Sequence, residues 1–261
     1  MDPDELLLFE APATALQRKP KDDHRDGIDI DIDTAIDTAA LTRDLDARGW
    51  TVVPGAVSRA ECEALRDLYA NDAAFRSRVV MQRHGFGQGE YRYFRYPLPR
   101  RVADLRAALY PSLVAIANRW HERLGIATRF PATHAEFIER CHAAGQTRPT
   151  PLLLRYGAGD YNCLHQDLYG EHVFPLQAVV LLSRPGTEFD GGELVLSEQR
   201  PRMQSRACVL PLAQGDLAIF AVNHRPVRGV RGDYRVAMRH GVSVLRSGER
   251  YTLGVILHDA R

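Results

Sequence analysis

The sequence has almost no lysine and no long apolar run, and both absences limit what the chain can be. Only two of its 34 basic residues are lysines, Lys19 and Lys21. Arginine suits a bidentate grip on phosphate or carboxylate, although a GC-rich genome gives the same bias without any function. No run approaches the roughly 18 apolar residues of a membrane span, and the acidic start lacks the basic region of a secretory signal. We therefore expect a cytoplasmic protein with no membrane partner.

Cysteine is also scarce, which argues against a disulfide scaffold and a structural zinc site. The four cysteines are widely spaced and form no Cys-x-x-Cys pair; they are Cys62, Cys141, Cys163 and Cys208. This pattern fits neither a disulfide framework nor a zinc knuckle, so we expect reduced thiols. A chain of 261 residues can still bury a large core, and all-β folds of this length commonly form one domain.

Charge divides the chain into two parts. Residues 1–40 contain eleven acids and four bases, whereas the rest contains 30 bases and 22 acids. The alternation of Ile and Asp over residues 27–37 would also fit an edge strand, but its charge favours a mobile segment. We expect residues 1–40 to form a flexible acidic tail without a catalytic role, and residues 41–261 to form a single catalytic domain.

Residues 41–150 are expected to form a mainly helical support. Capping boxes at Ser58 with Glu61 and at Thr133 with Glu136 predict two helices, the first reaching about residue 69 and the second ending at Gly145. Residues 102–124 show helical periodicity, with Pro111 as a kink or break.

From residue 151 onward, the pattern changes to short strands separated by Gly, Pro and Asp. The β-prone runs cover residues 152–156, 174–182, 193–196, 207–212, 217–222, 234–238 and 251–257. Many short strands after a helical half predict an α+β protein, in which N-terminal helices flank a double-stranded β-helix, or jelly roll, over residues 151–261.

A His-x-Asp pair followed by a distant His is typical of a facial triad that binds Fe(II) and leaves positions open for oxygen. The pair alone is weak evidence, because ten His and 20 Asp in this chain predict about 0.8 matches by chance. Of the two matches, His24-Arg25-Asp26 lies in the acidic tail and is set aside. His165-Gln166-Asp167 follows an apolar strand and a glycine turn.

The distant ligand is expected to be His240. It lies in a β-prone segment and is followed, ten residues later, by Arg250, whose guanidinium would then lie near the metal. His224 is the rival third ligand, but it lacks a following Gly-x-Arg. His258, at the end of the last strand, is expected to pack or cap. The predicted metal ligands are thus His165, Asp167 and His240.

These motifs resemble the Fe(II)- and 2-oxoglutarate-dependent dioxygenases. Residues 155–159 with 164–167 look like AlkB-type repair dioxygenases, whereas residues 190–194, 215–220 and 240–250 look like prolyl-hydroxylase-type members. The resemblance implies an oxidoreductase that uses Fe(II), 2-oxoglutarate and O2. It also implies that Arg250 pairs with the distal carboxylate of 2-oxoglutarate and that Tyr156 hydrogen-bonds this co-substrate. AlkB-type enzymes carry two arginines at a longer spacing after the third ligand, so the substrate does not follow from the resemblance.

A basic, aromatic segment over residues 78–106 is a candidate substrate lid. It holds seven arginines and two acids, with interleaved aromatic residues, as recognition of a single-stranded or flipped base would require. Its lid residues would be Arg83, Tyr91, Arg92, Tyr93 and Arg95. The alternative is an ordinary strand with its aromatic rings inward and its arginines in water. Gly85, Gly87 and Gly89 do not match a dinucleotide fingerprint, because no βαβ unit surrounds them.

The leading hypothesis for function is oxidative dealkylation of alkylated nucleobases in DNA or RNA, that is, repair. Further arginines in the catalytic half would support a polyanionic substrate if they shared a face with the lid; they are Arg200, Arg202, Arg206, Arg225, Arg228, Arg231, Arg235 and Arg239. The alternative is hydroxylation of a protein or peptide side chain. A metal-binding sensor without turnover is a third possibility, which a broken triad would have indicated.

Overall fold

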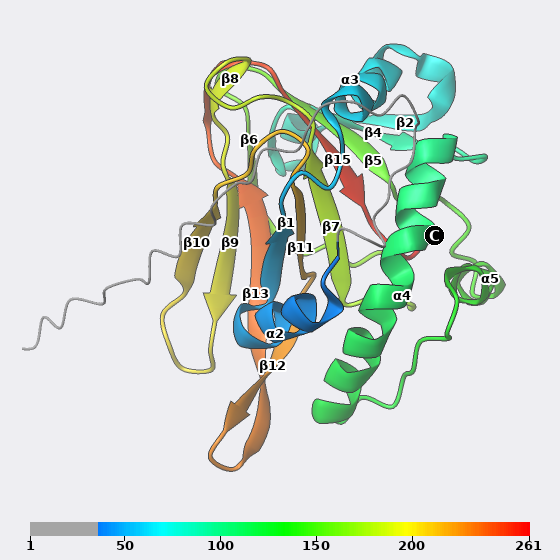
Figure 1. The fold of residues 1–261 in the computed structure, drawn as a ribbon, viewed down its shortest axis with the longest axis vertical. Helices are drawn as coiled ribbons and strands as arrows, with labels where there is room; N and C mark the ends of the chain where they lie inside the picture. Colours follow the sequence, from blue (N-terminus) through cyan, green and yellow to red (C-terminus); the bar gives the residue numbers. More distant parts are fainter. Residues whose placement is uncertain (1–35) are drawn as a thin grey trace, which may run out of the picture.

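Two antiparallel β-sheets pack face to face in the computed structural model, which describes residues 36–261 (Figure 1). The larger sheet has seven strands in the order β1 (Trp50–Val53), β11 (Leu217–Ala221), β7 (Leu176–Leu181), β15 (Arg250–Val255), β5 (Leu152–Tyr156), β4 (Glu90–Phe94) and β2 (Phe75–Val80). The second sheet has the order β10 (Arg206–Leu210), β9 (Leu194–Gln199), β13 (Gly232–Val242), β6 (Tyr161–His165) and β3 (Gly87–Gln88), and β12 (His224–Gly229) pairs with β13. A small ribbon joins β14 (Leu245–Gly248) to β8 (Phe189–Gly191). The predicted jelly roll is therefore confirmed.

Helices cover the outer face of the larger sheet (Figure 1). They are α2 (Thr38–Arg48), α3 (Arg59–Asp67), α4 (Arg100–Arg123) and α5 (His134–Ala143), with short 3-10 helices η1 (Leu68–Ala70), η2 (Asp72–Ala74) and η3 (Met81–His84). Leu105, Leu109 and Leu113 recur at helical spacing on α4 and are buried in one cluster with strand residues such as Leu153 and Val180. Burial of this apolar stripe holds α4 against the sheet.

Both predicted capping residues begin helices. The Ser58 hydroxyl accepts a hydrogen bond from the Glu61 backbone N–H at 3.3 Å, and α5 has a complete capping box between Thr133 and Glu136. The predicted break at Pro111 is wrong, because α4 continues through it. Helix α2 was not predicted, and its first residues, 38–40, lie within the predicted tail. Residues 1–35, including His24-Arg25-Asp26, lie outside the described residues.

The predicted helical support also contains strands. β1 pairs with β11, β3 pairs with β6, and β4 joins β2 to β5, so residues 41–150 contribute to both sheets. These strands are short and mix charged with apolar side chains, which weakens the periodicity on which a sequence prediction depends.

A buried ion pair connects the helices to the end of the chain. Arg106 on α4 lies 2.7 Å from a carboxylate oxygen of Asp259, and the hydroxyl of Tyr96 donates to the other oxygen at 2.8 Å. Both charged side chains are almost fully buried. Because burial removes water from both charges, removal of either partner would leave an uncompensated charge.

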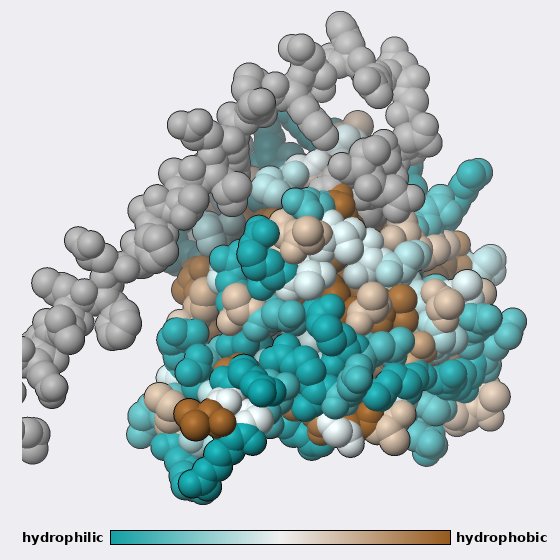
Figure 2. Space-filling view, turned by 60° about the horizontal axis from the view of Figure 1, so that its bottom comes forward, coloured by the Kyte–Doolittle hydropathy of each residue, from teal (hydrophilic) through white to brown (hydrophobic). Residues whose placement is uncertain are grey.

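The end of the molecule that carries the β12–β13 hairpin is mostly hydrophilic, with apolar side chains scattered over it (Figure 2). Such scattering is normal for a surface in water. No helix in residues 36–261 is long and apolar enough to cross a membrane.

Candidate metal centre

A cavity lined by polar and aromatic side chains lies between the two sheets. The cavity has a volume of about 320 Å³, which is at the lower end of the range typical of small-molecule sites. Three of the residues that line it are His165, Asp167 and His240, and Arg250 and Tyr156 line it as well. The structure thus brings together the five residues that the sequence motifs singled out.

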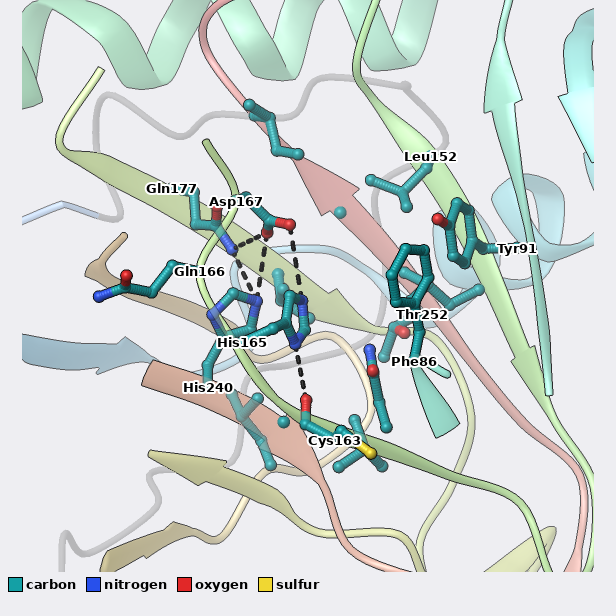
Figure 3. A pocket seen from close by; sticks show the side chains of 18 of the residues that line it. Phe86, Tyr91, Leu152, Cys163, His165, Gln166, Asp167, Gln177, His240 and Thr252 are labelled. Carbon is teal, nitrogen blue, oxygen red and sulfur yellow. Dashed lines mark hydrogen bonds and ion pairs between the residues drawn. The ribbon is translucent and has the colours of Figure 1, made fainter. Parts of the chain in front are cut away.

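The three predicted metal ligands converge within this cavity (Figure 3). One ligand atom from each of His165, Asp167 and His240 lies within 4.8 Å of the others. Nε2 of His165 is 3.5 Å and Nε2 of His240 is 3.2 Å from the Asp167 carboxylate. Two imidazoles and one carboxylate on one side of a cavity are the donor set of a facial triad, and the chemistry of these donors fits Fe(II).

Strand register explains how residues so far apart in sequence meet. β6 and β13 are antiparallel neighbours, and His165 is paired directly with His240 in their ladder. Gly241 allows this close approach, because a Cβ atom there would lie 2.6 Å from the carbonyl oxygen of Asn162. Any larger residue after His240 would push the two strands apart.

Hydrogen bonds and charges orient the triad. Nδ1 of His165 lies 2.8 Å from the Cys163 carbonyl oxygen, to which it donates, and its Nε2 is left facing Asp167. Burial alone would raise the pKa of Asp167, but hydrogen bonds and charges from His165 and His240 outweigh it and hold this pKa well below the ordinary value. Burial lowers the pKa of His240, so neutral imidazole, the ligating form, is favoured there.

Two neighbouring residues that the sequence analysis missed hold the carboxylate in place. The hydroxyl of Tyr169 donates to Oδ1 of Asp167 at 2.7 Å, and the side-chain amide of Gln177 donates to Oδ2 at 2.9 Å. The Gln177 amide nitrogen also lies 3.1 Å from Nε2 of His240 (Figure 3). Gln177 is the only polar residue of β7, an otherwise apolar strand, and this was the signal that could have identified it.

Arg250 and Tyr156 form a cationic end of the same cavity. They are paired across β15 and β5. Arg250 is 2% exposed, and its Nε and one terminal nitrogen have no hydrogen-bond partner among the described residues; the same is true of the Tyr156 hydroxyl. Burial lowers the pKa of Arg250 to about 10, so the guanidinium is still charged at neutral pH.

A buried cation without a carboxylate partner needs an anion from outside the chain. The carboxylate of a small dicarboxylic acid fits this requirement, and unpaired donors of Arg250 and Tyr156 remain free for it. Gly192 makes room for the guanidinium, because a Cβ atom there would lie 3.0 Å from Cδ of Arg250.

Residues 90–94 of the candidate lid form β4, a sheet strand paired with β2 and β5, as the strand interpretation of this part predicted. Tyr91 and Tyr93 face the cavity, as do their cross-strand partners Leu154 and Leu152. Arg92 lies on the opposite face, where it forms an ion pair with Asp72. Strand alternation accounts for this separation, because successive side chains point to opposite faces.

Of the remaining lid candidates, neither Arg83 nor Arg95 lines the cavity. Arg83 is exposed on η3 and Arg95 is exposed just after β4. Of the five lid candidates, Tyr91 and Tyr93 thus reach the cavity and the three arginines do not; a lid role for them stays a prediction.

Several arginines of the catalytic half are used in ion pairs. Arg200, Arg206 and Arg225 all lie within 4.0 Å of the Glu198 carboxylate, and Arg228 is 3.8 Å from Asp233. Because their charges are compensated by these acids, these arginines are weaker candidates for phosphate contacts.

The rival histidine lies elsewhere. His224 begins β12, where it pairs with Ala237, and it does not line the cavity. His258 is fully buried, and its Nδ1 accepts a hydrogen bond from the Phe174 backbone N–H at 3.2 Å. The prediction that His258 packs or caps is confirmed.

Comparison with known proteins assigns this chain to a family. Residues 89–260 match the model of the Oxygenase-NA family, described as an oxygenase catalysing oxidative methylation of damaged DNA. The chain is 52% identical over 167 residues to an uncharacterized protein of Mycobacterium tuberculosis, found in strains H37Rv and CDC 1551; the match covers 64% of this chain and 72% of the relative.

Solved structures share the fold. A prolyl 4-hydroxylase from Phytophthora capsici matches with a TM-score of 0.52 and 18% identity, over 89% of this chain and 66% of that chain. A prolyl-4-hydroxylase from Pseudomonas putida matches with a TM-score of 0.49 and 16% identity, over 86% of this chain and 99% of that chain. From the family match over residues 89–260, we conclude that this chain belongs to the Oxygenase-NA family and is an oxygenase, that is, an oxidoreductase, with a His-Asp-His donor set that fits Fe(II).

Proposed function

We propose that this protein oxidatively removes alkyl groups from damaged nucleobases in DNA or RNA. The observation that carries the proposal is the composition of the cavity wall around the triad. Tyr91, Tyr93 and Tyr169 line the cavity that contains His165, Asp167 and His240. Aromatic side chains stack on the face of any base, and an enzyme that modifies a base must hold it outside the helical stack. The family description, which concerns damaged DNA, supports the same substrate class.

In this proposal His165, Asp167 and His240 bind Fe(II), and Arg250 with Tyr156 binds the distal carboxylate of 2-oxoglutarate. Iron held there, with 2-oxoglutarate and O2, would supply the oxidant for hydroxylation of a carbon–hydrogen bond, with succinate and carbon dioxide as co-products. On an N-linked methyl group the product is N–CH2–OH, which breaks its carbon–nitrogen bond, returns the proton to nitrogen and releases formaldehyde.

The chain's own residues perform positioning and exclusion of water. Arg250 fixes the co-substrate from the closed end of the cavity, and Tyr169 with Gln177 fixes the Asp167 carboxylate. Leu152 and Leu154 extend the aromatic wall with apolar surface, which keeps water away from the reacting carbon.

A second candidate is hydroxylation of a protein or peptide side chain. The spacing of ten residues between His240 and Arg250 favours it, because this spacing resembles prolyl-hydroxylase-type enzymes rather than AlkB-type enzymes. The two candidates share iron and co-substrate and differ only in what enters the aromatic side of the cavity.

A succinate-coupled screen tests the proposal. The protein is supplied with Fe(II), 2-oxoglutarate and O2, and with either N-methylated oligonucleotides or a panel of peptides. We expect formaldehyde and succinate in equal amounts from at least one methylated oligonucleotide. Asp167→Ala should abolish both products, whereas the exposed Asp190→Ala should not. Turnover of peptides without turnover of any methylated oligonucleotide would overturn the proposal in favour of the second candidate.

A further inference from the structure

Large apolar side chains are exposed on β6, the strand that carries His165, and on the segments next to it. Phe86 and Leu164 are each 47% exposed and line the cavity, and Leu168, which follows Asp167 directly, is 49% exposed. Apolar side chains scattered singly over a surface need no explanation, but a group of them beside a cavity is typical of a binding surface. In Figure 3, Phe86 and Tyr91 lie on the side of the cavity away from Asp167 and Gln177.

Phe86 is held in its exposed position by the backbone. Its carbonyl oxygen accepts a hydrogen bond from the Cys163 N–H at 2.9 Å, and its own N–H donates to the Met81 carbonyl oxygen at 3.2 Å. The next residue, Gly87, has a φ of 131°, and a Cβ atom there would lie 2.3 Å from the Tyr161 carbonyl oxygen. Phe86 is therefore attached to β6, the strand that also carries His165.

A second ring stacks on Phe86, and a cation lies three residues before it in the chain. Its ring stacks on that of His84, with 5.4 Å between ring centroids and an angle of 22° between ring planes. Arg83, the preceding residue, is exposed and forms no ion pair with any residue in 36–261. Arg78 and Arg92, from the same basic segment, are by contrast paired with Glu90 and Asp72.

We propose that Phe86, stacked on His84, and the free guanidinium of Arg83 form a nucleotide platform at the mouth of the cavity. The platform stacks on the base next to the one being oxidised, and Arg83 contacts a phosphate of the same strand. A flat ring with an exposed face beside an uncompensated cation has the two features that single-stranded nucleic acid requires. This inference rests on the proposed function and assigns its substrate as a single-stranded or locally opened strand rather than a free nucleoside.

Binding of a fluorescent, unmethylated single-stranded oligonucleotide, followed by anisotropy, tests the stacking part. Phe86→Ala should weaken binding about 5- to 100-fold, the range for loss of one base–aromatic stack. Phe86→Trp should restore binding to within about threefold, because a larger ring offers a larger stacking face. Val230→Ala, which truncates an exposed apolar residue at the β12–β13 turn, is the control and should bind like the wild type. Thermal unfolding of each variant checks that the fold is intact.

Salt dependence tests the phosphate contact. For single strands, each phosphate contact contributes about 0.7 to the slope of log Kd against log salt concentration. Arg83→Gln should lower this slope by about 0.7, and the exposed Arg43→Gln on α2 should leave it unchanged.

The turnover assay separates failure of the platform from failure of the proposed function. We expect Phe86→Ala to lose kcat/KM on a methylated oligonucleotide by at least about fivefold more than on the methylated nucleoside alone. If the wild type demethylates oligonucleotides while Phe86→Ala and Arg83→Gln match it in binding and turnover, the platform is refuted and the proposed function stands. If the wild type acts on peptides alone, both are refuted.

Discussion

Two polar side chains, Arg250 and Gln177, are buried at positions where burial is energetically unfavourable unless a ligand is bound. Arg250 is a fully desolvated guanidinium with free donors, and Gln177 directs its amide between two members of the triad. A chain optimised only for stability would replace both with apolar residues. Their burial is expected if both serve binding, and each can be tested separately.

Arg250→Met should weaken 2-oxoglutarate binding. The substitution keeps most of the side-chain volume but removes the charge-assisted hydrogen bonds, each of which contributes about 1.5–3 kcal/mol. We expect Kd for 2-oxoglutarate to rise about 10- to 100-fold, measured by calorimetry with Mn(II) in place of iron so that no turnover occurs. Arg246→Met is the control, because Arg246 is exposed and paired with Asp190. An unchanged Kd in Arg250→Met would show that the carboxylate binds elsewhere.

Gln177→Ala should weaken metal binding, because the Asp167 carboxylate loses the amide that orients it. Removing such an outer hydrogen bond typically lowers metal affinity about 10- to 100-fold. Competition with a fluorescent chelator for Mn(II) would measure this loss. Gln214→Ala removes an amide that bonds only to the Leu182 carbonyl oxygen, and it should keep the wild-type affinity. Equal affinities for the two variants would mean that Gln177 has no positioning role.

At the scale of secondary structure, strand register positions the site, and the helices support the sheet that carries part of it. The pairing of His165 with His240 across β6 and β13 places two ligands side by side, and the pairing of Arg250 with Tyr156 across β15 and β5 does the same for the cationic end. The helices support the outer face of the larger sheet, so changes in them are expected to alter stability and leave the chemistry unaffected.

Thr133→Ala tests that separation. It removes the hydroxyl that accepts a hydrogen bond from the Glu136 N–H at 3.3 Å in the capping box of α5. We expect the free energy of unfolding to fall by about 1 kcal/mol, measured in urea, with an unchanged KM for 2-oxoglutarate. Thr128→Ala, on the exposed segment before α5, should cause no comparable loss. A fall in activity at full stability would contradict a purely supporting role.

At the scale of the whole molecule, one half-buried and one fully buried histidine at the junction between helices and sheet should make stability depend on pH. His134 donates to the Leu257 carbonyl oxygen and His258 is fully buried. Burial lowers the pKa of each to about 4, from an ordinary value of 6.5. Between these values the unfolded chain binds protons that the folded chain does not, so stability must fall as pH decreases from about 6.5 to about 4.

Urea unfolding of the metal-free protein at pH 7.0, 5.5 and 4.5 would measure this effect, with an upper limit of roughly 3 kcal/mol per histidine. His134→Gln can keep a donor toward Leu257 but cannot titrate, so its stability should depend less steeply on pH. A variant curve parallel to that of the wild type would refute the assignment to His134.

Local patterns were sufficient to predict a large part of this architecture. The capping residues Ser58 and Thr133 act through neighbours three residues away, so their helices were correctly placed. Strands of the second half were recognisable by their apolar content: β11 is a continuous apolar run, and β5 is interrupted only by Arg155. For β4 the sequence left a strand and a lid as alternatives, since its alternating aromatic and charged residues fit both, and β2 was not predicted.

What the sequence determined by itself was the set of donors: two His, one Asp and one Arg at spacings that allow a metal and a dicarboxylate to be bound. Only the tertiary structure decided which histidine faces Asp167, that Gln177 and Tyr169 orient it, and that Tyr91 faces the cavity while Arg92 turns away. The physical reason is the distance along the chain over which each kind of contact acts. Spacing along the chain encodes contacts within a strand or turn, whereas burial and pairing between strands depend on the packing of the whole fold.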